Sequence, residues 1–176
     1  MNLNLIAKET LHTELLNDGT WQKVDFYDLS TSSTFWNRAA ILTLDKKNAA
    51  TVPAALIYLI QKETRVLGIW QSQWNTRTPK LLDFINFFVA EKGFSNIEGK
   101  LISVDAFWDS YSTTIAGISS ESDFESTKNE KKEPFTEPIK KETILQVVCF
   151  DDEWNEHNFL IETEDQWVLY HWASAA

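Results

Sequence analysis

The sequence predicts an α+β fold, namely a single domain with a mainly antiparallel twisted sheet of about six to seven strands and three to four helices packed on it. The chain has 176 residues, which is the size of one domain, and 43% of them are hydrophobic, enough for a substantial core. Segments with strand-like alternation occur between a few segments of helical period. The last three apolar segments follow one another through short connections, as in a meander.

Helical periodicity and capping residues predict the helices. Thr78 is an N-cap residue, Pro79 follows at the first helical position, and Gly93 ends the clearest helix. Thr51 and Pro53 begin another helix in the same way. The expected helices span residues 3–17, 51–63 and 78–92, with a fourth favoured over 105–118, part of which also fits a strand.

Alternating or continuous apolar segments predict the strands. The segment 143–150 is apolar on both faces, which is typical of an interior strand. Three C-terminal strands alone would be marginally stable, so they are expected to join the strands from the first part of the chain. The expected strands span residues 21–28, 35–44, 66–74, 97–104, 143–150, 158–163 and 166–172.

The polar segment 119–141 interrupts this pattern. It contains two prolines and offers only Phe124, Phe135 and Ile139 for burial. The entropy lost on ordering such a segment should exceed the gain from so little apolar area. The prediction is therefore one domain, residues 1–176, that carries a mobile loop at 119–141.

The net charge of the chain is −10, and most of it lies in one region. Residues 121–165 contain 14 acidic residues against five lysines. Such a surface would attract a basic protein by long-range electrostatics, and exposed Trp side chains would anchor it. The predicted function is therefore a non-catalytic binding or regulatory protein with a basic protein partner. The expected contact residues form one cluster: Asp151, Asp152, Glu153, Trp154, Glu156 and His157.

Two alternatives remain open. The element Glu98-Gly99-Lys100 matches the short Glu-x-Lys pattern of metal-dependent nucleases, in which the carboxylate binds the ion and the ammonium stabilises developing charge. The chain also has eight Trp residues, and Trp70, Trp74 and Trp108 could line a pocket for a small ligand.

Several classes are not expected. The single cysteine, Cys149, excludes an intramolecular disulfide, and no glycine-rich phosphate loop or catalytic motif is present, so no cofactor is predicted and an enzyme is disfavoured. An acidic chain is poorly suited to phosphate backbones, so direct binding of nucleic acid is not expected. Neither a signal peptide nor an apolar stretch long enough to span a membrane is recognised, so a cytosolic protein is expected.

Overall fold

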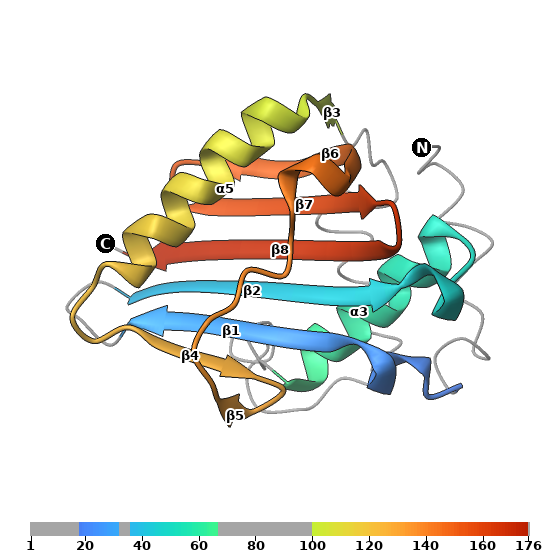
Figure 1. Ribbon diagram of the computed structural model, residues 1–176, viewed down its shortest axis with the longest axis horizontal. Helices are drawn as coiled ribbons and strands as arrows, with labels where there is room; N and C mark the ends of the chain where they lie inside the picture. The colour runs from blue at the N-terminus through green and yellow to red at the C-terminus, as the bar shows by residue number, and fades with distance from the viewer. Residues whose placement is uncertain (1–17, 32–35, 67–99, 176) are drawn as a thin grey trace. The chain divides into compact units, whose positions relative to one another are not determined.

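The computed structural model describes residues 18–31, 36–66 and 100–175. These residues form an α+β structure with one eight-stranded antiparallel sheet, in the order β3-β6-β7-β8-β2-β1-β4-β5, and two α-helices (Figure 1). The predicted α+β class and antiparallel sheet are confirmed, although the sheet has eight strands instead of six to seven. The expected helices at 3–17 and 78–92, and the strand expected at 66–74 beyond its first residue, lie outside the described residues.

The chain divides into two compact units, residues 1–24 with 44–98, and residues 25–43 with 99–176. The second unit contains nearly the whole sheet. The single domain expected for residues 1–176 remains a prediction. The strands are β1 (Asp25–Thr31), β2 (Trp36–Asp45), β3 (Lys100–Ile102), β4 (Glu125–Lys128), β5 (Lys131–Lys132), β6 (Ile144–Glu153), β7 (Glu156–Thr163) and β8 (Gln166–Ala175).

The C-terminal meander joins the first hairpin, as expected from the sequence. β1 pairs with β2 from Asp25↔Thr43 to Thr31↔Asn37, and β6, β7 and β8 pair in chain order. β8 lies beside β2 in the sheet, and β3 pairs with β6 at the edge. Buried strand residues such as Ile41, Phe159 and Tyr170 stabilise this arrangement, at about 2 kcal/mol for each fully buried large apolar side chain.

Helix α5 (Val104–Ser119) covers one face of this sheet (Figure 1). The Ser103 hydroxyl begins the helix because it accepts a hydrogen bond from Ala106 N at 3.1 Å. The helix buries one helical face, formed by Phe107, Tyr111, Ile115 and Ile118. These side chains pack with apolar residues of β1, β2, β6, β7 and β8 in one core. The ambiguous segment 105–118 is therefore a helix.

Residues 119–141, expected to be a mobile loop, contain β4 and β5, and the chain then returns to β6 across the face that α5 covers (Figure 1). We call residues 133–143 the strap. Ile139 on the strap is only 1% exposed, and Phe135 packs against the same core as α5. The turn between β4 and β5 places Asn129 and Glu130 at φ 48° and 67°.

The described part of the first unit contains two 3₁₀ turns, Thr20–Lys23 and Lys46–Asn48, and helix α3 (Val52–Val66). The helix expected over 51–63 is confirmed, and Leu56, Leu59 and Ile60 are buried. Tyr58 of α3 donates a hydrogen bond to Asp18 Oδ2 at 2.5 Å. No helix in the described residues combines the length and apolar character that crossing a bilayer requires.

Candidate functional site

The acidic cluster expected at 151–157 lies at one end of the β6–β7 hairpin, and we call these seven residues the acidic hairpin. The strand pairing runs to the end of the hairpin, with Asp152 opposite His157 and Glu153 opposite Glu156. Only Trp154 and Asn155 remain for the turn. The turn is therefore shorter than the segment 151–157 that separates the two expected strands, and the strands themselves carry the acidic positions.

Trp154 is 75% exposed, more than the other exposed large hydrophobic side chains of the described residues, Leu101 and Leu145. The backbone beside it is fixed, because Asn155 O accepts a hydrogen bond from Ser174 N of β8 at 2.9 Å. The indole thus projects into solvent from a turn that is tied to a third strand. An exposed aromatic ring on an ordered backbone loses little conformational entropy when a partner covers it.

His157 lies behind this turn, in contact with aromatic and polar side chains of the second unit. Its ring centroid is 4.5 Å from the ring of Trp172, and its Nδ1 is 3.5 Å from Ser110 Oγ of α5. Trp172 in turn donates from Nε1 to Asn37 Oδ1 at 2.6 Å. The imidazole is half-buried, so its contacts support the hairpin rather than extend toward solvent.

Glu156 is half-buried, and its Oε1 accepts a hydrogen bond from Asn158 Nδ2 at 2.9 Å. This bond holds the carboxylate on the hairpin, two residues from Trp154. On α5, Asp109 is exposed and directly precedes Ser110, which contacts His157. Asp109 is therefore the acidic residue of α5 next to the contact with the acidic hairpin, whereas Asp105 pairs with Lys141.

The predicted Trp-lined pocket is only partly described. Trp70 and Trp74 lie outside the described residues. Trp108 is half-buried on α5, where its ring centroid is 5.5 Å from that of Tyr111 and it packs against the core. In these contacts Trp108 helps to pack α5 against the core.

The nuclease-like element is also only partly described, since Glu98 lies outside the described residues and Lys100 is exposed on β3. A site of this kind needs a further acid on a neighbouring strand, but Asp25 and Asp105 make other contacts. Asp105 pairs with Lys141 at 2.8 Å, which lowers the pKa of its carboxyl, and Asp25 accepts from Asn129 Nδ2 at 2.9 Å. Within residues 18–31, 36–66 and 100–175, no group of three His, Cys, Asp or Glu residues is placed to hold a metal ion.

A cavity of about 230 Å³ lies in the second unit, and no pattern in the sequence predicts it. Its lining comes from β1, β4 and the strap: Tyr27, Ser126, Thr127, Lys128, Glu133, Pro134, Phe135, Thr136, Glu137 and Pro138. Most of these residues belong to the segment that was expected to be a mobile loop. Phe135 was the available signal, because large aromatic side chains are more often buried than exposed.

Lys128 is the cationic residue of this lining. Its ammonium lies 5.1 Å from the centroid of the Tyr27 ring, and the Tyr27 hydroxyl raises the pKa of Lys128. No protein-family model, curated protein or solved structure matches this chain.

Proposed function

We propose that this protein is a non-catalytic binding protein whose acidic hairpin docks a basic protein partner. The observation that carries the proposal is the 75% exposure of Trp154 on a turn whose backbone is hydrogen-bonded to β8. Trp is among the residues that contribute most to binding when a partner desolvates them. Elsewhere in the second unit, aromatic side chains such as Phe107, Tyr111 and Phe159 are buried.

The charge of the chain supports a basic partner. Residues 121–165 contain 14 acidic residues against five lysines, and the acidic hairpin lies within this segment. Carboxylates on a protein rim raise the association rate with a cationic surface, and they do so less as salt is added. An indole also attracts Lys and Arg side chains through its π face. The acidic hairpin therefore offers both long-range attraction for a basic partner and an exposed indole that the partner can cover.

The test is capture of partners on the immobilised full chain in low and in moderate salt, with the retained proteins identified and their charge recorded. Wild type is compared with Trp154→Ala and with Leu145→Ala, which also truncates an exposed apolar side chain (57% exposed) but lies outside the acidic hairpin. A basic protein that is retained by wild type and Leu145→Ala, and lost with Trp154→Ala and with added salt, supports the proposal. Equal retention by Trp154→Ala and wild type, or no salt-sensitive basic partner, contradicts it.

A further inference from the structure

A carboxylate and two tyrosines meet where the strap crosses the covered face of the sheet. Tyr111 of α5 and Tyr170 of β8 have ring centroids 5.0 Å apart, in an edge-to-face arrangement. The Tyr111 hydroxyl donates to Glu137 Oε1 of the strap at 2.5 Å, and the same oxygen accepts from Ile139 N at 3.0 Å. Glu137 as a residue is exposed, but this oxygen is directed onto the tyrosines.

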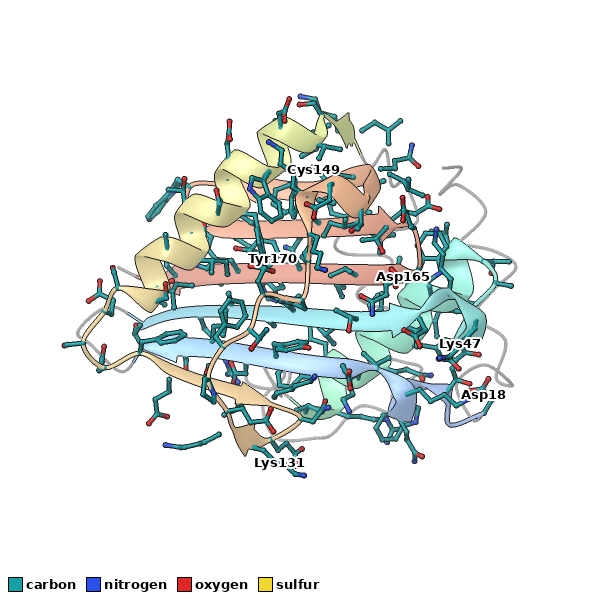
Figure 2. All side chains as sticks on the ribbon, viewed as in Figure 1. Asp18, Lys47, Lys131, Cys149, Asp165 and Tyr170 are labelled. Carbon is teal, nitrogen blue, oxygen red and sulfur yellow. The ribbon has the colours of Figure 1, made fainter. Side chains whose placement is uncertain are left out.

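Tyr170 is completely buried, and its hydroxyl has no hydrogen-bond partner among the described residues. Figure 2 labels Tyr170 on β8, in the part of the face that the strap crosses. The Thr114 hydroxyl lies near enough to lower the pKa of Tyr170, but the two oxygens do not meet the geometry of a hydrogen bond. A buried hydroxyl without an acceptor is uncommon, because leaving such a donor unpaired costs free energy.

Glu137 also lines the cavity of about 230 Å³, so one residue contacts both the cavity and the Tyr111 hydroxyl. The other walls include the rings of Tyr27 and Phe135, and Lys128 supplies a positive charge. The cavity therefore combines aromatic and proline side chains with polar and charged groups in similar measure.

Burial and hydrogen bonding act on the Glu137 carboxylate in opposite directions. Burial raises the pKa of Glu137, although the bonds from Tyr111 and Ile139 N act in the opposite direction. Burial, together with the charge of Glu137, raises the pKa of both Tyr111 and Tyr170, so both remain hydrogen-bond donors at neutral pH. The strap thus holds a carboxylate against one hydroxyl while the second hydroxyl has no acceptor.

We propose that the hydroxyls of Tyr111 and Tyr170 form a binding site for the carboxylate of a small organic acid with an apolar body, and that Glu137 is an internal competitor for this site. A carboxylate has two oxygens and can accept from both hydroxyls at once. A ligand that displaces Glu137 would return the Glu137 side chain to water, and its carboxylate would accept a hydrogen bond from the Tyr170 hydroxyl. The apolar body of the ligand would lie in the cavity against Tyr27 and Phe135.

The charge of the lining defines the ligand class further. Lys128 favours an anion, whereas Glu133 and Glu137 disfavour a second negative charge. The ligand is therefore a monocarboxylate. The carboxylate can belong to a free acid or to the C-terminus of a peptide, since both present the same group.

The experiment is isothermal titration of the full chain with benzoate, with the neutral analogue benzamide, and with N-acetylphenylalanine, which mimics a peptide C-terminus. Wild type is compared with Glu137→Ala, which removes the competitor, and with Glu133→Ala, which removes an acid of the same cavity lining that has no bond to either tyrosine. The expected result is binding of benzoate or N-acetylphenylalanine to Glu137→Ala at least about tenfold tighter than to wild type and Glu133→Ala, with no binding of benzamide. If benzoate binds more tightly, the ligand class is a free acid, and if N-acetylphenylalanine binds more tightly, it is the C-terminus of a peptide.

Tyr111→Phe and Tyr170→Phe in the Glu137→Ala background should each weaken the acid by about tenfold or more, because each removes one donor. Equal affinity for benzoate and benzamide, or affinity that both Phe substitutions leave unchanged, overturns the proposal. So does the absence of acid binding to a Glu137→Ala chain that unfolds cooperatively. If that variant does not fold, Glu137→Ser replaces it, because its side chain is too short to make the bond to Tyr111, with the same expected gain over wild type and the same contradicting results. Trp154→Ala in the Glu137→Ala background should bind the acid as tightly as Glu137→Ala alone. This result would separate the carboxylate site from the acidic hairpin.

Discussion

Asn129 joins the β4–β5 turn to the backbone of Phe26 in β1 through two hydrogen bonds. Asn129 N donates to Phe26 O at 2.8 Å, and Phe26 N donates to Asn129 Oδ1 at 2.9 Å. Asn129 Nδ2 adds a bond to Asp25 Oδ1 at 2.9 Å. Asn tolerates the left-handed φ of 48° found here better than most residues, so one side chain both allows the turn and pairs it with the neighbouring strand.

We expect Asn129→Ala to lower the free energy of unfolding by about 2 kcal/mol, since it leaves Phe26 N without its acceptor and strains the turn. Urea denaturation followed by circular dichroism measures this change. The matched control is Lys131→Ala, whose side chain is exposed on β5 and should change stability by less than about 0.5 kcal/mol. Equal stability of the two variants would contradict the role given to Asn129.

Glu130 follows Asn129 with φ 67°, a conformation that costs non-glycine residues free energy. Glu130→Gly removes the clash of Cβ and should raise the free energy of unfolding by up to about 1 kcal/mol, reduced by the greater entropy of glycine in the unfolded chain. The same urea titration tests this. A loss of more than about 0.5 kcal/mol would show that the turn does not require a left-handed residue here.

Ile139 tests whether the strap contributes to the stability of the second unit. Its side chain is 1% exposed within the core that α5 forms with the sheet. Ile139→Ala should therefore cost about 2–4 kcal/mol, the range for truncating a buried aliphatic side chain. Leu145→Ala is the control, since Leu145 is 57% exposed. A cost below about 0.5 kcal/mol for Ile139→Ala would indicate that the strap is dispensable for the core.

The sequence predicted the elements with strong periodicity. α3, α5 and the strands of the C-terminal meander were expected close to their positions, because their apolar patterns repeat over several turns or residues. The strands β4 and β5 were missed, since all of their residues are polar. These strands are held in place by residues far away in the sequence, as in the hydrogen bond between Asn129 and Phe26. Local sequence patterns contain no information about such contacts.

The candidate sites follow the same division. The acidic hairpin was found from its composition, although its pairing to Glu153 and its two-residue turn were not. The pair Tyr111 and Glu137 was missed because its residues lie 26 positions apart, one on a helix and one in the expected loop. Composition reveals charge on a surface, whereas a polar contact inside a core depends on the topology.

Trp154 gives a direct optical test of the acidic hairpin. Because its indole is 75% exposed, Trp154→Phe should reduce the acrylamide-accessible fraction of the tryptophan fluorescence. Trp167→Phe is the comparison, since Trp167 is 5% exposed, and it should leave that fraction nearly unchanged or slightly higher. If both substitutions change quenching equally, the Trp154 indole is covered in solution.

Glu137 should make stability depend on pH in a direction opposite to most carboxyls. Burial raises its pKa in the folded chain above the value of about 4.5 in the unfolded chain, so the folded chain binds more protons between those two values. The contribution of Glu137 to stability is therefore fully present below the unfolded value and is lost as pH rises through the folded pKa. Glu137→Gln has no such group, and its amide oxygen can still accept from Tyr111.

The measurement is the free energy of unfolding of wild type and Glu137→Gln at a series of pH values from about 7 down to 4. Subtracting the two curves cancels the carboxyls that both chains share. We expect the stability of wild type relative to Glu137→Gln to rise as pH falls, because protonation removes a charge that burial disfavours. A difference that stays constant would show that the Glu137 carboxylate is solvated, and one that falls as pH falls would show that the bonds from Tyr111 and Ile139 N stabilise the anion. In either case the competition proposed at Tyr111 and Tyr170 would lose its electrostatic basis.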